Sequence, residues 1–412
     1  MSPSSSLLQP GQPDRLPTRT YRFVCAQVMS QSVSIMSVSM SAVAGATLAS
    51  HPSLATLPYG TQMAASLLFT YPASLAMKRL GRRPVFLAAA LVLILAGLCG
   101  AWAMQQHSLP GLVLAHALMG LFSSAAGYYR FAALDDLPAT LKPKALSRVI
   151  ASGLIAALIA PWLVTHMRLT PGLQEFAAAY ACLVGFGLAT LAILWGLKAP
   201  PEAFADAGTT GSTPSSPSAL TATDWRPAAR LAIACSAWSA LVMTLLMIAS
   251  SLQLKSLCGF DDAAQAIQWH VLAMFTPSFF TGTLISRFGV RRVLLTGLTA
   301  LGAAVVLGGQ ADSFASLSAA LVVLGLGWSF TFVGGTTLLA QRCPAEHRHR
   351  WQGLHDLCVA GCSTLGAFAP APLLHQLQWQ GLHLWVLPLA VIMLVAVSAG
   401  LRPSPAAATA AA

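Results

Sequence analysis

The chain has 412 residues, of which 56% are hydrophobic and 8% are charged, and its mean hydropathy is +0.68. Soluble domains carry about 25% charged residues, so this composition excludes a soluble globular protein and indicates one embedded in a lipid bilayer. The net charge of +11 could indicate nucleic-acid binding, but the 23 Lys and Arg residues lie in short clusters between apolar runs, which excludes that class.

Apolar runs follow one another along nearly the whole chain. A polar, proline-rich tail over 1–21 precedes the first run, which is too long and too rich in Ser and Gln for a cleaved signal peptide. A helix needs about 20 residues to cross the hydrocarbon core. Runs of that length predict twelve transmembrane helices, at 22–48, 53–77, 84–104, 109–134, 147–166, 175–197, 229–254, 265–286, 290–309, 315–341, 354–376 and 382–401.

The long polar interruption at 198–228 is rich in Ser, Thr, Pro and Gly, a composition typical of a flexible linker. It separates an N-terminal half of six spans (22–197) from a C-terminal half of six spans (229–402), which a tail over 403–412 follows. We therefore predict an all-α integral membrane protein built from two pseudo-symmetric six-helix bundles.

Basic residues are distributed unequally between the two sets of loops. With the N-terminus inside, the loops on the outer face carry Arg168 and Lys255, and nearly all other basic residues fall on the inner face. The positive-inside rule then places both termini and the linker in the cytoplasm. We expect a monomeric, multi-pass protein of the bacterial inner membrane, surrounded by lipid.

Polar side chains within the spans are candidates for a solute pathway, because such groups are expensive in hydrocarbon. The first span has serines on one face, which indicates either a hydrogen-bonding wall or close helix packing. His270 could titrate near neutral pH, although a lone histidine in a bundle is more often scaffolding. The predicted pathway residues are Gln27, Gln31, Ser34, Gln62, His116, Arg130, Gln268 and His270.

Small and polar residues line one face of the fourth span, at spacings of 4, 3, 4 and 3: His116, Gly120, Ser123, Gly127 and Arg130. Such a stripe faces a cavity or a neighbouring helix. Arg130 lies about one turn inside the cytoplasmic end. It either contacts an anionic solute group or a gating carboxylate, or it snorkels to the interface.

One short sequence occurs at equivalent places in both halves. The segment between spans 2 and 3 reads SLAMKRLGRR over 74–83, and the segment between spans 8 and 9 reads GTLISRFGVRR over 282–292. Each contains Arg-x-Gly followed by a basic pair. Many secondary transporters are built from internal repeats, with the solute bound between the repeats near mid-membrane.

The two loops resemble the signature Gly-x-x-x-Asp-Arg-x-Gly-Arg-Arg of the major facilitator superfamily. The matching positions are Arg79, Gly81, Arg82 and Arg83 in the first copy, and Gly282, Arg287, Gly289, Arg291 and Arg292 in the second. The resemblance implies a transporter that moves a small solute by alternating access and needs no cofactor. Since the first span lines the cavity in this family, its serines are better interpreted as a pathway wall.

Lys78 stands where the family has an acid that faces the positive N-terminal end of span 11. A lysine there needs a nearby carboxylate, and Asp356 lies at the start of that span. We hypothesise that Lys78 and Asp356 form a polarity-swapped latch. The family's second latch implies that Arg82 pairs with Asp135 or Asp136. The predicted gating residues are Lys78, Arg79, Gly81, Arg82, Asp135, Asp136, Arg287, Gly289 and Asp356.

Protons are the expected coupling ion, and Asp356 with the adjacent His355 is the best protonatable site, because no acid lies deep in a central span. A carboxylate beside a lysine and a helix start is held in its charged form, which suits a latch. Separation from Lys78 in the other conformation would favour protonation of Asp356.

The direction of transport is left open by the sequence. The glycine and proline pattern that marks antiporters in span 5 is only partly present, with Gly153 and Pro161 matching but Ala156 and Ala160 at glycine positions. Efflux of a drug or metabolite is slightly favoured over proton-coupled uptake of a metabolite or siderophore-like compound.

A remote alternative is an integral-membrane enzyme, which needs a clustered acid, base or metal constellation. The sequence contains no HExxH motif, paired intramembrane carboxylates or nucleophile motif, so no catalytic residue is predicted. The segment EHRHR at 346–350 interleaves arginines with histidines and is better interpreted as a solvated loop. We expect no metal, no cofactor and no nucleic-acid partner.

Overall fold

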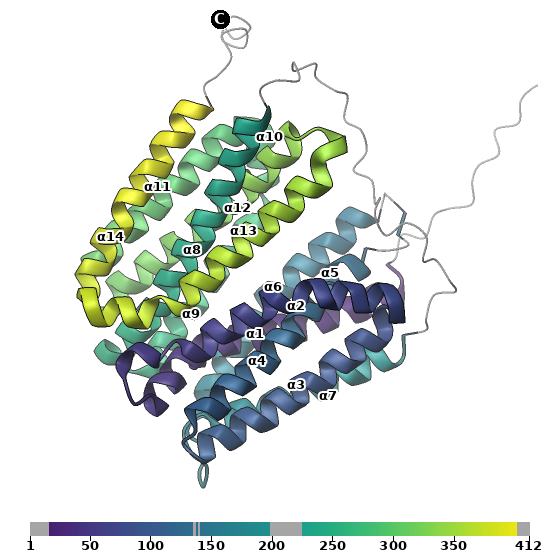
Figure 1. Ribbon diagram of the computed structural model, residues 1–412, viewed down its shortest axis with the longest axis vertical. Helices are drawn as coiled ribbons and strands as arrows, with labels where there is room; N and C mark the ends of the chain where they lie inside the picture. Colours follow the sequence, from purple (N-terminus) through teal and green to yellow (C-terminus); the bar gives the residue numbers. More distant parts are fainter. Residues whose placement is uncertain (1–15, 135–136, 139–140, 198–224, 402–412) are drawn as a thin grey trace, which may run out of the picture.

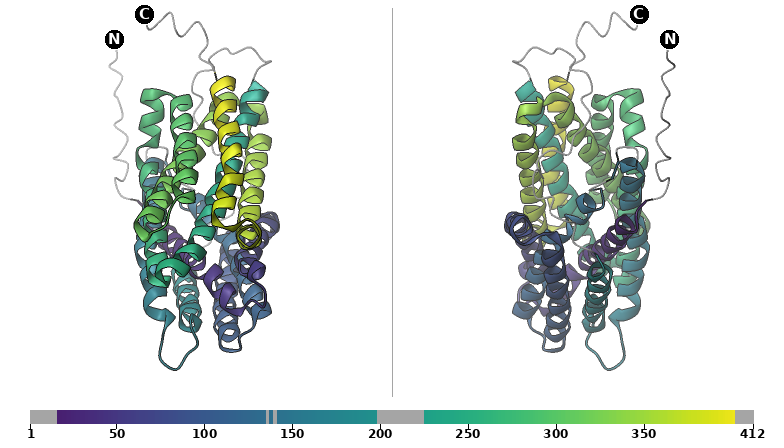
Figure 2. Two further views of the ribbon diagram at one scale, coloured as in Figure 1. Left: turned by 90° about the vertical axis from the view of Figure 1, so that its left-hand side faces the viewer. Right: turned by 90° about the vertical axis from the view of Figure 1, so that its right-hand side faces the viewer.

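The computed structural model describes residues 16–134, 137–138, 141–197 and 225–401, and every regular element in these ranges is a helix. Figure 1 shows two groups of helices stacked along the longest axis, and Figure 2 shows the same arrangement from two sides. The N-terminal half contains α1 (Thr18–Leu48), η1 (Pro52–Leu54), α2 (Leu57–Leu80), α3 (Arg82–Gln105), α4 (Leu109–Ala126), α5 (Tyr129–Ala132), α6 (Lys142–Arg168) and α7 (Ala177–Trp195). The C-terminal half contains α8 (Trp225–Cys258), α9 (Phe260–Phe275), η2 (Thr276–Phe279), α10 (Thr281–Phe288), α11 (Val290–Gly309), α12 (Phe314–Arg342), η3 (Ala345–His347), α13 (Arg348–Phe368) and α14 (Pro370–Gly400).

The surface of α3 shows why the fold needs lipid. Leu91, Leu95, Leu98 and Trp102 are each more than half exposed and share one helical face. The opposite face is buried and rich in small residues, and a Cβ at Gly97 would lie 2.9 Å from the backbone nitrogen of Val184 on α7. Bulky residues outside and small residues between helices are typical of membrane bundles.

Nine helices of the described residues are long and apolar enough to cross a membrane. The other predicted spans correspond to α2, to α13 and to the segment from α9 to α10. These three spans are less apolar or shorter than the other nine. Helix α13 contains charged residues, α2 contains polar residues, and η2 interrupts the segment from α9 to α10. The prediction of an all-helical membrane protein is confirmed.

Spans 4 and 8 are interrupted where the sequence predicted continuous helices. Span 4 divides into α4 and α5 at Gly127 and Tyr128. Span 8 divides into α9 and α10 around η2, at Pro277. Proline lacks the N–H that continues the hydrogen-bond ladder, and glycine loses more chain entropy than other residues in a helix.

Most predicted helix boundaries differ from the structure by a few residues, and two differences change the division of the chain. Span 11 was expected at 354–376, but α13 ends at Phe368 and α14 starts at Pro370, because proline fits the first turn of a new helix. Within α14 the left-handed Gln378 (φ 59°) separates a short helix over 370–377 from the longer one that follows. The predicted linker was expected to reach 228, but α8 begins at Trp225; residues 198–224 lie outside the described residues.

The two Arg-x-Gly loops adopt the same backbone conformation. Arg79, Gly81 and Arg83 recur 208 positions later as Arg287, Gly289 and Arg291. The glycines have φ 89° and ψ 158° in the first loop and φ 84° and ψ 151° in the second, a region in which side chains are rarely found. Each glycine N–H donates to the carbonyl four residues earlier, which ends one helix and starts the next.

Candidate functional site

The halves meet through α1 with α8, α2 with α13, α6 with α9 and η1 with α14. In Figure 1 the two groups of helices lie together near η1 and the turn from α8 to α9, and they diverge towards the end that carries both Arg-x-Gly loops. We call that diverging end the loop end. A pathway between the halves is therefore closed at one end of the molecule.

Arg168 holds the halves together at the closed end. This residue lies in the last turn of α6 and contacts Glu175 of its own half at 3.1 Å and Asp261 of the other half at 3.3 Å. Its guanidinium also lies 4.8 Å from the ring centroid of Phe260. A cation suits the end of α6, and an acid suits the first turn of α9, because of the helix dipoles. We call Arg168, Glu175, Phe176, Phe260 and Asp261 the clasp.

Phe176 completes the clasp from an unusual backbone conformation. Its φ of 65° is left-handed, its side chain is fully buried, and its N–H donates to the carbonyl of Arg168. Its ring packs edge-to-face on Phe260 with the centroids 5.0 Å apart. A left-handed residue other than glycine costs about 1–2 kcal/mol, so burial against the other half must hold it there.

A second contact closes the same end between α2 and α13. The hydroxyl of Thr56 donates to the carbonyl of Phe368 at 3.0 Å. A Cβ at Gly60 would lie 2.2 Å from the ring of Phe368, so only glycine permits this approach. Beside it, His51 and His375 bring their ring centroids within 5.0 Å. Neither the clasp nor this contact could be predicted from local patterns in the sequence, because each joins residues of the N-terminal half to residues of the C-terminal half.

Helix α1 packs against both halves, since it contacts α6 and α7 as well as α8 and α9. Gln27, Gln31 and Ser34 are partly exposed there. The Oε1 atom of Gln27 is buried and has no hydrogen-bond partner among the described residues. As residues of a solute pathway, Gln27, Gln31 and Ser34 stay a prediction.

Gln62 and His116 form a buried network inside the N-terminal half. His116 Nδ1 lies 2.8 Å from Gln62 Oε1, and its Nε2 lies 2.8 Å from the hydroxyl of Tyr180. The hydroxyl of Ser37 also donates to Gln62 Oε1. An amide oxygen only accepts, so Nδ1 carries the proton, and Nε2 accepts from Tyr180 in the neutral ring. Both predicted pathway residues thus link α1, α2, α4 and α7 in this conformation.

His270 has the equivalent place in the C-terminal half, 208 positions after Gln62. It is fully buried, and its Nδ1 donates to the carbonyl of Leu321 on α12 at 2.7 Å. A Cβ at Gly325, also on α12, would lie 2.6 Å from the carbonyl oxygen of His270. His270 therefore anchors α9 to α12, while the neighbouring Gln268 is partly exposed.

Arg130 is exposed near the loop end, with its guanidinium 4.7 Å from the ring centroid of Phe131. No carboxylate of the described residues forms an ion pair with it.

The proposed latch is not formed in this conformation. Lys78 is exposed, and Asp356 is 77% exposed and 3.0 Å from Nδ1 of His355. No ion pair joins Lys78 to Asp356, both of which the structure describes. The predicted partners Asp135 and Asp136 lie outside the described residues. Arg79 is exposed, and the guanidinium of Arg287 lies 5.4 Å from the ring centroid of Phe288.

The last basic residue of the first loop and its equivalent in the second make matching contacts that the sequence did not indicate. Arg83 donates to the carbonyl of Trp195 at 2.7 Å, and Arg291 donates to the carbonyl of Ser398 at 3.3 Å. Trp195 ends α7, and Ser398 lies near the end of α14. Each loop therefore holds the end of the last span of its own half.

Two aromatic residues of α12 were also missed. Trp328 and Phe332 stack with their ring centroids 5.1 Å apart and an interplanar angle of 10°, and both are partly exposed. The indole Nε1 of Trp328 has no partner among the described residues, and Phe332 lies 6.0 Å from the ring of His355. Their spacing of four is typical of helix packing, so the sequence alone does not distinguish them.

Comparisons with known proteins agree with this arrangement. Residues 260–412 match the family described as Major Facilitator Superfamily. The riboflavin transporter RfnT of Brucella anthropi is 34% identical over 395 residues, which cover 93% of this chain and 96% of that protein. The MFS-type transporter YddS of Bacillus subtilis is 36% identical over 104 residues, 25% of this chain and 24% of that protein.

Solved structures share the fold at low identity. A D-xylose–proton symporter superimposes with a TM-score of 0.71 at 12% identity, over 94% of this chain and 98% of that one. The nucleoside transporter NupG superimposes with a TM-score of 0.65 at 13% identity, over 93% of this chain and 99% of that one. The family indicated by the two Arg-x-Gly loops is confirmed, and this chain belongs to the major facilitator superfamily as a secondary transporter.

Proposed function

We propose that this protein carries riboflavin, or a solute with a similar flat heterocycle, across the cytoplasmic membrane. The observation that carries the proposal is the 34% identity to a riboflavin transporter along 93% of the chain. The aligned region covers both halves and therefore the interface between them, where transporters of this kind bind their solute.

Aromatic side chains of α12 and polar side chains of α1 fit such a solute. Riboflavin has an uncharged three-ring system with polar edges and a chain of hydroxyls. The parallel pair of Trp328 and Phe332 offers an aromatic stacking surface, and aromatic pairs of good geometry contribute about 0.5–1.5 kcal/mol beyond their buried area. The unpartnered Nε1 of Trp328 can donate to a ring carbonyl, and Gln27 Oε1 can accept from an imide or hydroxyl.

The test is riboflavin flux into proteoliposomes, followed by flavin fluorescence. Trp328→Leu removes stacking and the donor, and we expect KM to rise at least about tenfold, which is about 1.4 kcal/mol. Trp385→Leu is the matched control, because that tryptophan of α14 is 70% exposed. An absence of saturable riboflavin flux in the unaltered protein would refute the proposal. Riboflavin is supplied either inside or outside the vesicles, and the two directions of flux are measured separately. Their comparison distinguishes efflux, which the sequence slightly favours, from uptake.

Alternating access is proposed to proceed between the described conformation and its opposite. Here the clasp is closed and the halves diverge at the loop end, which positive-inside charge would place in the cytoplasm. For the pathway to open at the clasp end, the ion pair between Arg168 and Asp261 must break. The ring contact between Phe176 and Phe260 must break as well. Closing the loop end would bring α2 towards the first half of α13, where Lys78 and Asp356 could form the latch. Asp356 lies eight residues after the start of α13 at Arg348, and not at the helix start that the sequence predicted.

The latch is tested by charge reversal. Lys78→Asp and Asp356→Lys each place like charges together when the loop end closes, so we expect each to lower the transport rate. The double variant restores an attractive pair and should recover transport at normal expression. A double variant no better than either single variant would exclude the latch.

Proton coupling is proposed to use His355 and Asp356. His355 is 3.0 Å from Asp356 and its ring centroid lies 6.0 Å from that of Phe332, so a protonation change there lies next to the proposed stacking surface. An imposed pH gradient should drive riboflavin accumulation, and an uncoupler should abolish it. Riboflavin accumulation that changes with neither the pH gradient nor the uncoupler would exclude this coupling site.

A further inference from the structure

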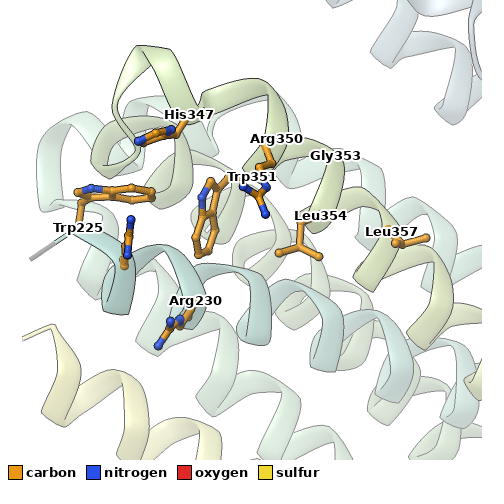
Figure 3. Close-up of a pocket in the computed structure, with 9 residues that line it drawn as sticks. Trp225, Arg230, His347, Arg350, Trp351, Gly353, Leu354 and Leu357 are labelled. Atoms are coloured by element: carbon orange, nitrogen blue, oxygen red, sulfur yellow. The ribbon is translucent and has the colours of Figure 1, made fainter.

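A cleft opens at the loop end of the C-terminal half. Its volume is about 550 Å³, and it lies between the start of α8 and the start of α13. Figure 3 shows the side chains around it. They are Trp225, Arg226, Arg230, His347, Arg350, Trp351, Gly353, Leu354 and Leu357.

Aromatic rings build one end of this cleft. Trp225 stacks on His347 with the centroids 5.4 Å apart and the planes 23° apart. Trp351 meets Trp225 edge-to-face at 5.2 Å. Figure 3 places these three rings together, with the two leucines at the opposite end of the cleft. The rings join α8, η3 and α13, so this end is a packed wall.

Three arginines contribute positive charge from two helices. Arg226 lies over Trp225, with its guanidinium 5.7 Å from a ring centroid. Arg226, Arg230 and Arg350 are all exposed, and no carboxylate of the described residues forms an ion pair with any of them. Among the described residues, the carboxylate of Glu346 contacts His347 at 3.5 Å. Three like charges therefore line one cleft, and no carboxylate of residues 225–401 pairs with them.

The other end of the cleft is apolar and open. Leu354 is 44% exposed and Leu357 is 58% exposed. Leu357 lies seven residues along α13 from Arg350, which is about 10 Å at 1.5 Å per residue. The polar zone of a bilayer is about 5–8 Å thick on each side, so the arginines lie at headgroup depth when Leu357 reaches hydrocarbon.

We propose that this cleft binds the phosphate headgroup of an anionic phospholipid, with the acyl chains against Leu354 and Leu357. Arginine recognises phosphate oxygens with paired N–H donors, and tryptophan is favoured at headgroup depth. A soluble phosphate would use the arginines but leave the leucines exposed, which favours the lipid. Bound lipid would bridge α8 and α13 and stabilise the C-terminal half, whatever solute the protein carries.

The experiment follows thermal unfolding of the full chain in neutral detergent during titration with phosphatidylglycerol or phosphatidylcholine. We expect phosphatidylglycerol alone to raise Tm. The triple variant R226Q/R230Q/R350Q should need at least about tenfold more phosphatidylglycerol for half of that rise, since each basic residue near an anionic lipid contributes about 1 kcal/mol. The matched control R148Q/R292Q/R342Q loses three exposed arginines outside the cleft and should respond like the unaltered protein.

Three results would overturn the proposal. One is an equal response to phosphatidylglycerol in the cleft variant and the control. Another is a response to phosphatidylcholine as large as that to phosphatidylglycerol. The third is protection by inorganic phosphate or glycerol 3-phosphate as strong as that by the lipid, which would make the ligand a soluble phosphate. If the triple variant does not fold, native mass spectrometry of R350Q and R292Q compares the phosphatidylglycerol that each retains, and the proposal requires less on R350Q.

Discussion

At the scale of single residues, burial separates polar side chains that looked alike in the sequence. Gln62 and His116 were grouped with Gln27 and Gln31 because all lie in apolar runs. In the structure the first two are at most 1% exposed and hydrogen-bonded to each other, whereas the glutamines of α1 are partly exposed. The hydroxyl that completes the network belongs to Tyr180, on a helix distant in the chain, so no local pattern could reveal it.

This network predicts a stability effect. His116→Leu leaves the buried hydroxyl of Tyr180 without an acceptor and should cost about 1–3 kcal/mol of folding free energy. Adding Tyr180→Phe removes that hydroxyl too, so the double variant should be more stable than His116→Leu alone. Thermal unfolding in detergent measures the difference. Additive losses would show that the pair does not interact.

At the scale of elements, the repeated loop does more than end two helices. Its glycines adopt a positive φ that lets one span follow the next without a linker, a role the family signature implies. The contacts of Arg83 and Arg291 with the ends of α7 and α14 add a second role. Spans 8 and 11 show the limit of prediction from the apolar pattern. Pro277 and Pro370 lie within apolar runs, and both interrupt the helix that the pattern predicted.

The loop arginines predict matched losses in the two halves. Arg83→Gln and Arg291→Gln each weaken a charged hydrogen bond to a helix end, and we expect about 1–3 kcal/mol less stability for each. Arg292→Gln is the control, since Arg292 is exposed next to Arg291. Thermal unfolding of the three variants measures this. Equal stability of Arg291→Gln and Arg292→Gln would contradict the assigned role.

At the scale of the whole molecule, the clasp sets which end of the pathway is closed. Asp261 is 61% exposed, so its ion pair with Arg168 is worth roughly 1 kcal/mol or less. The ring contacts of Phe260 add a comparable amount. An interaction of this size can make one conformation the more populated one. A solute that binds the other conformation more tightly can still reverse the populations.

Weakening the clasp should shift the conformational equilibrium. Asp261→Arg places like charges together, and we expect the population open at that end to rise about fivefold, equivalent to about 1 kcal/mol. Arg168→Asp combined with Asp261→Arg should reverse the shift. Labelling of a cysteine at Ser34 from the clasp end, in a chain whose native cysteines are replaced, reports the opening. Labelling that does not change with Asp261→Arg would contradict the gating role.

The sequence by itself determined the membrane environment, the helical spans and the family, because these depend on local quantities: apolar length, charge between runs and a loop repeated at a fixed interval. The tertiary structure decided which residues work together. Arg168 with Asp261, Tyr180 with His116, and Trp225 with Trp351 each join segments far apart in the chain. Such pairs leave no local pattern, since their proximity arises only when the two bundles fold and meet.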